Sequence, residues 1–294
     1  MVGTALQPVV GGSRRTRVAT ASLNGSWPGH EAVRLAERRT PDGRLGMAVD
    51  SHQQLGYRID APGHGRFLVA PDGTSIGCDL PPGPAWRWHR PFFSQALPLA
   101  ATLQGLELLH ASAVSIEGRA IGFVGHSGAG KTSLAIHLVA RGARLLTDDV
   151  LALEAGQAGL LAYPGVQMAN VADEELRSLS GSARAALGKP IGTSDKVHLA
   201  VETLATPVPL AALYFLRRGP QIDELSFEPL QPADPRLLLG ATFMPHVTTP
   251  ARLRAQLETC AQATETVANF ALSVPAGFGA ARLAEAVERH QASL

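Results

Sequence analysis

The sequence predicts an α/β protein in which a small β-rich segment precedes a larger core built around a phosphate-binding loop. Short strand-like runs separated by turn residues fill the region between residues 45 and 80. Beyond residue 110, helical and strand-like segments alternate, which is typical of α/β layers. A glycine-rich motif lies between one such apolar run and a helix-like run. We therefore expect two domains, a β-rich domain over residues 1–95 and a core domain over residues 96–294.

Composition sets the broad class of protein. The chain has 294 residues, of which 45% are hydrophobic, so it can bury a substantial core and is not disordered. Lys plus Arg is 26 and Asp plus Glu is 25, giving a net charge of +1. Proteins that hold nucleic acid are usually far more basic, so we expect no nucleic-acid partner. We also expect no signal peptide and no membrane helix, because no apolar stretch follows the early arginines and no window approaches 18 apolar residues. The two cysteines agree with a cytoplasmic location.

The front segment shows strand and turn signals. Strands are expected at Gly56–Asp60 and Arg66–Ala70, and Pro71-Asp72-Gly73-Thr74 is a strong turn signal before a further strand. The proline-rich run at 81–84 excludes helix and central strand, and so closes the β unit.

A helix is expected from Phe92 to Leu109, because leucines recur every three or four residues along it. Aromatic residues gather at its start, and they have two interpretations, a satellite core or the lining of an acceptor groove: Trp86, Trp88, Phe92 and Phe93. Packing is the more common role at this spacing.

The most informative segment matches G-x-x-x-x-G-K-[ST] at every fixed position. In such a loop, glycines allow backbone N–H groups to point at phosphate oxygens. Lys131 would supply a positive charge to the β- and γ-phosphates, and the hydroxyl of Thr132 would bind Mg²⁺. A strand-like run, Ile121–Val124, precedes the loop and a helix-like run, Lys131–Arg141, follows it, which strengthens the prediction. The predicted nucleotide-binding residues are Gly125, His126, Ser127, Gly128, Ala129, Gly130, Lys131 and Thr132, with His126 at a variable position that faces outward.

Two adjacent carboxylates, Asp148 and Asp149, end the next strand-like run. Neighbouring strand residues point to opposite faces, so both can serve one site only if the chain bends there. One carboxylate would hold Mg²⁺ and the other would accept a proton from an attacking hydroxyl. We predict Thr132 and Asp149 as metal ligands, and leave open which of the two aspartates is the base. Asp148 lies only 17 residues after Lys131, a spacing that favours kinases over switch proteins with long insertions.

Two further residues are candidates with competing structural roles. His110 precedes the loop strand, where it either caps or fills the core or polarises a reacting group near neutral pH. Lys196 is either a second phosphate contact or an exposed loop lysine.

The order of these motifs resembles the HPr kinase/phosphorylase family and its HPr-kinase-related relatives. The resemblance is strong from Leu109-His110 through the glycine-rich loop to Asp149, and weaker through Tyr163-Pro164-Gly165, Asp195-Lys196 and 210–216. It implies a P-loop fold similar to phosphoenolpyruvate carboxykinase, with ATP or another nucleoside triphosphate and Mg²⁺ as cofactors. It also implies His110 as the catalytic histidine and Lys131 as the phosphate-binding lysine. The family's Glu-x-Arg-Gly-x-Gly signature is absent, and Asp173 or Glu174 is the candidate replacement for its metal ligand.

Three functions follow as alternatives. The resemblance favours a kinase that phosphorylates a serine of a peptide or small protein, as in relatives that modify ribosomal peptides such as lasso peptides. A small-molecule P-loop kinase is the second, although such enzymes usually begin at the loop and here 124 residues precede it. A nucleotide-dependent switch without an acceptor is the third. Homo-oligomerisation is left open.

Overall fold

The computed structural model describes residues 15–23, 27–28, 30–193 and 196–294, which divide into two compact units. Unit 1 comprises residues 1–106 and 244–254, and unit 2 comprises residues 107–243 and 255–294. The elements of unit 1 are β1 (Arg17–Thr20), β2 (Val33–Arg39), β3 (Leu45–His52), β4 (Gly56–Ala61), β5 (Gly65–Val69), β6 (Ser75–Asp79), α1 (Trp86–Pro91), the π-helical turn η1 (Phe92–Ala96) and α2 (Leu97–Leu103).

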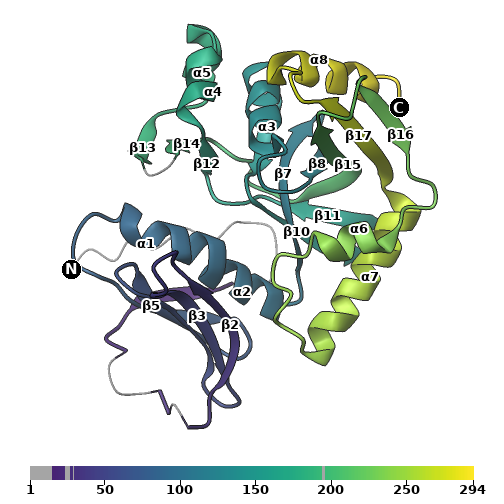
Figure 1. The fold of residues 1–294 in the computed structure, drawn as a ribbon. Helices are drawn as coiled ribbons and strands as arrows, with labels where there is room; N and C mark the ends of the chain where they lie inside the picture. Colours follow the sequence, from purple (N-terminus) through teal and green to yellow (C-terminus); the bar gives the residue numbers. More distant parts are fainter. Residues whose placement is uncertain (1–14, 24–26, 29, 194–195) are drawn as a thin grey trace. The chain divides into compact units, whose positions relative to one another are not determined.

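Unit 1 is one six-stranded sheet in the order β1-β6-β5-β4-β3-β2, covered by its helices on one face (Figure 1). Alternation along the strands puts Val49, Ile59 and Phe67 in one cross-strand row, and all three are buried. Phe92 of η1 is 0% exposed and its ring centroid lies 5.9 Å from that of Phe67. Phe92 is therefore a core residue, as the packing interpretation of the aromatic cluster expects.

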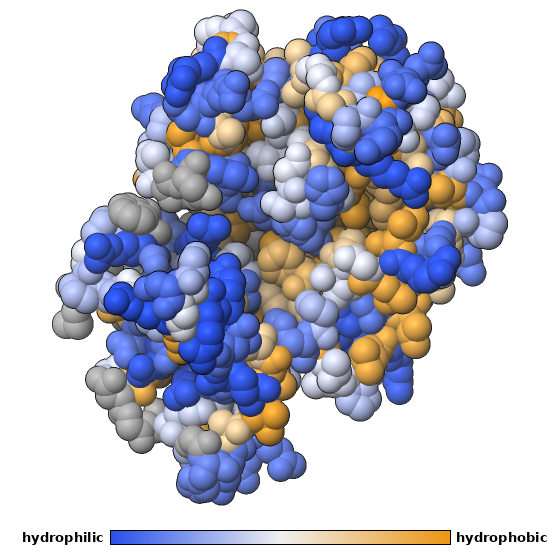
Figure 2. Space-filling view, in the orientation of Figure 1, coloured by the Kyte–Doolittle hydropathy of each residue, from blue (hydrophilic) through white to orange (hydrophobic). Residues whose placement is uncertain are grey.

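The opposite face of this sheet carries charged side chains. Asp50 accepts hydrogen bonds from Arg34 and, at 3.0 Å, from Arg58, whose guanidinium lies 5.2 Å from the ring centre of Trp27. Hydrophilic residues accordingly gather over the strands of unit 1 in Figure 2. Among the described residues, no helix has the length and apolar character needed to cross a membrane.

The predicted strands and turns of the front segment are confirmed by β4, β5 and β6, but the predicted helix from Phe92 to Leu109 is wrong at its end. The helix starts earlier and stops at Leu103, and Leu109 lies in a strand. Gly105, at φ +90°, breaks the helical spacing, and Leu106 follows it as the last residue of this part of unit 1. The unit boundary therefore falls after residue 106, whereas the sequence placed it at 95.

Unit 2 contains the glycine-rich loop. Its elements up to residue 171 are β7 (Glu107–Ile116), β8 (Arg119–Val124), α3 (Lys131–Ala140), β9 (Arg144–Thr147), β10 (Val150–Gly156), β11 (Gly159–Tyr163) and β12 (Met168–Val171). The remaining ones are α4 (Asp173–Ser178), α5 (Gly181–Ala186), β13 (Pro190–Thr193), β14 (Val197–Ala200), β15 (Val208–Gly219), β16 (Ser226–Pro229), α6 (Pro235–Gly240), α7 (Pro250–Thr266, in unit 2 from Ala255), β17 (Ala268–Pro275) and α8 (Ala280–Gln291).

The main sheet of unit 2 runs β11-β10-β7-β8-β15-β17-β16, and β9 pairs with β7. Strands β8, β15 and β17 are mutually parallel, whereas β7 is antiparallel to β8. Two hydrophobic cores flank the sheet, one containing residues of α3 and α8 and the other containing residues of α6 and α7 (Figure 1). The α/β class is therefore confirmed, although four strands follow α3 before the next helix, so the alternation is less regular than expected.

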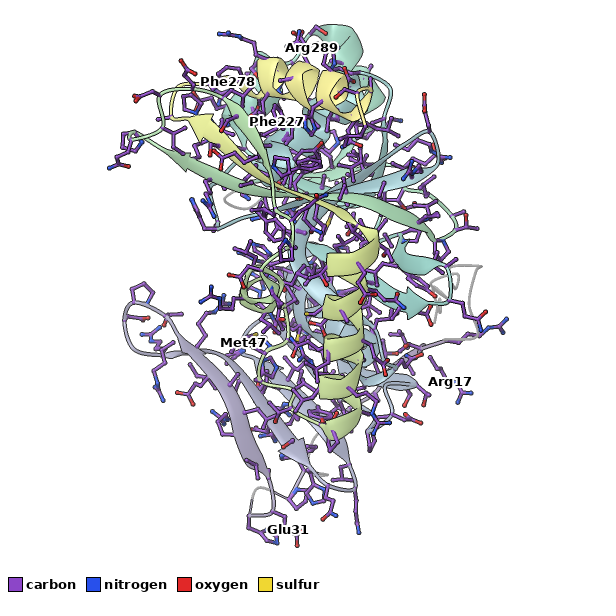
Figure 3. The ribbon with its side chains drawn as sticks, turned by 90° about the vertical axis from the view of Figure 1, so that its right-hand side faces the viewer. Arg17, Glu31, Met47, Phe227, Phe278 and Arg289 are labelled. Atoms are coloured by element: carbon purple, nitrogen blue, oxygen red, sulfur yellow. The ribbon has the colours of Figure 1, made fainter. Side chains whose placement is uncertain are left out.

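At the edge of the main sheet, aromatic residues hold α8. Phe227 of β16 lies beside α8 (Figure 3), and its ring stacks on His290 with centroids 4.4 Å apart. Tyr214 of β15 is 0% exposed and its hydroxyl lies 2.7 Å from Nδ1 of His290. Burial raises the pKa of Tyr214 to about 12 and lowers that of His290, so both are neutral near pH 7.

A three-stranded sheet in the order β12-β14-β13 lies beside α3. Ala169, Val171 and Leu199 are buried in the same core as the apolar side of α3. Helix α4 continues from β12 and is tied to α3, since Nε2 of His137 lies 2.8 Å from Oε1 of Glu175.

The contact between Glu175 and His137 should make stability pH-dependent. The hydrogen bond from His137 lowers the pKa of Glu175 from 4.5, so its stabilisation is present above that value and lost as the pH falls through the lower folded pKa. We expect Glu175→Gln to reduce the free energy of unfolding at pH 7 by about 1 kcal/mol. Chemical denaturation of both proteins from pH 7 to pH 3 should show this difference shrinking, while exposed Glu174→Gln changes little. A difference that is constant with pH would contradict the assignment.

Candidate active site

The glycine-rich loop, residues 125–132, joins the carboxyl end of β8 to the start of α3. Gly128 and Gly130 have φ of +84° and +97°, a region that side chains with a Cβ rarely adopt. Gly125 is closely packed, because an added Cβ would lie 3.0 Å from the carbonyl oxygen of Leu216. The positions of the motif glycines thus correspond to the backbone conformations that the loop needs.

Lys131 turns back over the loop. Its Nζ donates hydrogen bonds to the carbonyl oxygens of Gly125, at 2.8 Å, and His126, at 3.2 Å, and lies 3.3 Å from Nε2 of His110. The residue is only 6% exposed, and burial lowers its pKa. A buried ammonium group held at the loop mouth is well placed to meet an anion.

His110 joins the loop to the acidic pair. β7 is antiparallel to β8, so the start of β7 lies at the edge where β8 ends. Burial first, and the charge of Lys131 second, lower the pKa of His110, which makes the ring neutral near pH 7. Its Nδ1 lies 3.1 Å from the carbonyl oxygen of Asp149, so Nδ1–H donates there and Nε2 accepts from Lys131.

The chain bends at the acidic pair, as two carboxylates serving one site require. Asp149 has φ of +68°, a conformation that Asp tolerates better than most residues. The bend is closed by the amide of Val150, which donates to the carbonyl of Asp148 at 2.9 Å, and by the hydroxyl of Thr147, which donates to the carbonyl of Val150 at 2.7 Å. Both carboxylates therefore lie in one cluster rather than on opposite faces of a strand.

Asp148 accepts hydrogen bonds at both oxygens. Oδ1 accepts from Ser112 and Thr132, each at 2.8 Å, and Oδ2 accepts from the amide of Asn170 at 3.0 Å. Burial, and secondly the charge of Asp149, raise the pKa of Asp148. Thr132 thus contacts Asp148, whereas the residues predicted together as metal ligands are Thr132 and Asp149.

The carboxylate of Asp149 accepts fewer hydrogen bonds than that of Asp148. Its Oδ2 accepts from Nδ2 of Asn170 at 3.0 Å, and within the described part of the chain its Oδ1 has no hydrogen-bond partner. The side-chain Oδ1 of Asn170 in turn lies 2.5 Å from Nδ1 of His198. Asp149 therefore has one oxygen held in place and one available.

Gly165 packs against Thr147, the residue before the acidic pair. A Cβ at this position would lie 2.1 Å from Oγ1 of Thr147, and the amide of Gly165 donates to the carbonyl of Leu146 at 2.8 Å. We expect Gly165→Ala to displace Thr147 and to destabilise the protein by about 1–3 kcal/mol, as measured by chemical denaturation. Gly277→Ala is the matched control, because a Cβ there meets no atom within 4 Å. Equal stability of the two variants would contradict this close packing.

Arg218, the second-to-last residue of β15, lies beside the loop. A Cβ placed on Gly130 would be 3.6 Å from its Nη2, and Nη1 donates to the carbonyl of Phe278 at 3.0 Å. Its Nε is buried and has no hydrogen-bond partner among the described residues. A second cation thus borders the loop on the side away from His110.

The other predicted residues make fewer contacts with His110, Lys131 and the acidic pair. Lys196 is exposed, but its charge contributes to lowering the pKa of both His110 and Lys131. His126 is exposed, with Nδ1 2.7 Å from the carbonyl of Ser127. Asp173 is exposed and pairs with Arg177, and among the described residues neither Asp173 nor Glu174 has a hydrogen bond or ion pair with the acidic pair. In the part of the chain that the structure describes, no three His, Cys, Asp or Glu side chains lie together as metal ligands, so neither acid forms a metal-binding group with Asp148 and Asp149.

Four residues of the site were not predicted from the sequence. Ser112 has a readable signal, since it stands two residues after His110 on the same face of one strand. Arg218 has a weaker one, as a cation at the carboxyl end of an apolar strand, where ligands of open α/β sheets bind. Asn170 and His198 have none, because only strand pairing brings residues this far apart together.

The chain is also similar to proteins of known structure. No protein-family model matches the chain, and no curated protein matches it. Among solved structures, the chain is similar to the HPr(Ser) kinase/phosphatase from Coxiella burnetii, with 14% sequence identity and a TM-score of 0.35. The match covers 64% of this chain and 97% of that chain. At this TM-score and identity, the functional inference rests on the geometry of the site.

Proposed function

We propose that the protein is a nucleotide-dependent kinase that transfers the γ-phosphate of ATP to a serine hydroxyl of a peptide or small protein. The observation that carries the proposal is the convergence of Lys131, His110 and the acidic pair at the end of the glycine-rich loop. Phosphate-binding groups and a proton acceptor in one place are the parts that phosphoryl transfer needs, because catalysis there is mostly positioning and charge neutralisation.

The chemical step uses these residues in turn. Backbone N–H groups of the loop and Lys131 bind the β- and γ-phosphates. The acceptor oxygen forms a bond to the γ-phosphorus as the bond to the bridging oxygen of ADP breaks, and its proton passes to Oδ1 of Asp149. Neutral His110 holds Lys131 on one side and the backbone of Asp149 on the other, which sets the separation between the phosphate site and the base.

The residues also fit a magnesium ion. Mg²⁺ prefers oxygen ligands and is usually held by one or two carboxylates together with substrate phosphates. Thr132 and Asp148 already meet at 2.8 Å, so they are the pair that would hold the ion. When bound, Mg²⁺ would neutralise charge on the phosphate oxygens. In this proposal Asp148 is the metal ligand and Asp149 is the general base that accepts the proton.

The acceptor class rests on the family resemblance. Relatives of the HPr kinases phosphorylate serine, and some modify ribosomal precursor peptides of the lasso type, so a peptide serine is the first acceptor to test. A small-molecule kinase is the second candidate. The open Oδ1 of Asp149 suits any hydroxyl, and only the acceptor distinguishes the two.

The test is phosphate transfer by the full chain with Mg-ATP. Serine-containing peptides, the same peptides with alanine at that position, and a panel of hydroxylated metabolites that includes free serine are incubated separately and analysed by mass spectrometry. One added phosphate on the serine peptides alone supports the proposal. Transfer only to metabolites favours the small-molecule kinase, and ATP hydrolysis with no labelled acceptor favours a switch protein.

A further inference from the structure

We propose that Asn170, held in one orientation by His198, is a positioning residue that keeps Asp149 aligned to accept the proton. This inference rests on the proposed function for the role of Asp149, but the geometry that supports it is independent of the acceptor. Neither Asn170 nor His198 belongs to the motifs from which the site was predicted.

Asn170 contacts both carboxylates with different atoms. Its backbone amide donates to Oδ2 of Asp148 at 3.0 Å, and its side-chain Nδ2 donates to Oδ2 of Asp149 at 3.0 Å. The two aspartates are thus held by one residue, at a spacing that the backbone of β12 sets. Asp148 accepts hydrogen bonds at both oxygens, from this amide and from Ser112 and Thr132, whereas Asp149 keeps Oδ1 available.

His198 determines which way the carboxamide of Asn170 points. The side-chain Oδ1 of Asn170 lies 2.5 Å from Nδ1 of His198, so Nδ1 carries the proton and donates. A reversed carboxamide would put its oxygen against the carboxylate of Asp149, where two acceptors repel, and would turn the NH₂ group toward the N–H of His198. The pair therefore has one favourable orientation, in which Asn170 always donates to Asp149.

Strand pairing supplies this arrangement. Asn170 and His198 are directly opposite each other in the antiparallel pair β12–β14. Their sequence neighbours Ala169 and Leu199, opposite each other in the next row, are buried in the core that contains α3. Since alternate residues point to opposite faces, burial of Ala169 and Leu199 turns Asn170 and His198 to the face that meets the acidic pair.

Nuclear magnetic resonance tests the geometry directly. The asparagines of the chain are Asn24, Asn170 and Asn269, so selective ¹⁵N labelling of asparagine side chains gives few NH₂ signals. The signal lost in Asn170→Ala identifies Asn170. We expect Asp149→Ala to move one of the two Asn170 NH₂ proton signals upfield. We expect His198→Phe to shift or broaden both Asn170 NH₂ signals. The buried Asn269 pair, which donates to Ala263 and Val267, should not move and is the internal control. An Asn170 pair unchanged in both variants would overturn the proposal.

Kinetics test the positioning role. Partners that orient a reacting group typically change activity by about 10- to 100-fold when removed. We expect Asn170→Ala to lower kcat for peptide phosphorylation by about that factor with KM for ATP unchanged, and His198→Phe to lower it by about tenfold. His198→Asn, whose side-chain amide can replace Nδ1 as a donor, should restore most of kcat. The double variant Asn170→Ala/His198→Phe should be no slower than Asn170→Ala alone.

The two measurements separate the possible failures. Additive losses in the double variant, or no rescue by His198→Asn, would show that His198 does not act through Asn170. If the parent protein transfers no phosphate to any acceptor, the proposed function fails, and the role of Asn170 in transfer fails with it. The NMR experiment then still decides whether His198 orients Asn170, because it needs neither nucleotide nor acceptor.

Discussion

Lys131→Ala should lower kcat for phosphate transfer by about 10²- to 10³-fold, the usual effect of removing one preorganised group that stabilises transition-state charge. Lys131 is the only one of the described lysines that is buried at the loop, with Nζ bonded to two loop carbonyls and in contact with His110. Since its charge is partly desolvated, water cannot replace it fully. The measurement is initial-rate kinetics at saturating Mg-ATP with a serine peptide.

Lys189→Ala is the matched control for this experiment. Lys189 is exposed, and its backbone carbonyl oxygen accepts a hydrogen bond from the amide of Ala200 at 2.9 Å, which the substitution leaves in place. Its removal should leave kcat unchanged. Transfer by Lys131→Ala at the parent rate would show that the loop does not serve phosphoryl transfer.

Asp149→Asn should lower kcat by about 10²- to 10⁴-fold, the range for loss of a general base. Asparagine tolerates positive φ, so the bend at φ +68° survives the substitution and the effect reports chemistry rather than backbone strain. Binding of ATP, measured by calorimetry, should change little, because the phosphates are held by the loop and Lys131.

Asp148→Asn should give a different pattern. Asp148 accepts from Thr132, Ser112 and the amide of Asn170, so its loss should raise the Mg²⁺ concentration needed for half-maximal activity and also reduce stability by about 1–3 kcal/mol. If instead Asp149→Asn shifts the Mg²⁺ requirement and Asp148→Asn lowers kcat alone, the two roles are the reverse of those we assign.

Local sequence signals predicted those parts of the fold that local chemistry determines. Turn residues at Pro71–Thr74 separate β5 from β6, and the apolar run at Ile121–Val124 became the strand before the loop. The prediction that the helix reaches Leu109 was wrong, because leucine spacing alone cannot distinguish the end of α2 from the buried strand β7 that follows it. The contribution of residues 244–254 to unit 1 has no local signal, since it depends on contacts between distant segments.

For the site, the sequence indicated the charged residues but not how they are arranged. The motif located Lys131 and Thr132, and the adjacent acids predicted a bend that Asp149 indeed adopts at φ +68°. Which carboxylate faces Thr132 depends on the direction of that bend, which no residue pattern encodes. Asn170 contacts the acidic pair from β12, and pairing of β12 with β14 brings His198 to Asn170, so tertiary structure was needed to find both.

The most direct test of the central claim uses ATP labelled with ¹⁸O at the three terminal oxygens of the γ-phosphate. The full chain is incubated with this nucleotide, Mg²⁺ and the serine peptides, and peptide and phosphate are analysed by mass spectrometry. We expect labelled phosphate on the serine hydroxyl with the parent protein, and strongly reduced labelling with Lys131→Ala and Asp149→Asn. Label found only in inorganic phosphate with every acceptor tested, or equal labelling of the peptide by both variants, would contradict the assignment of this site to serine phosphorylation.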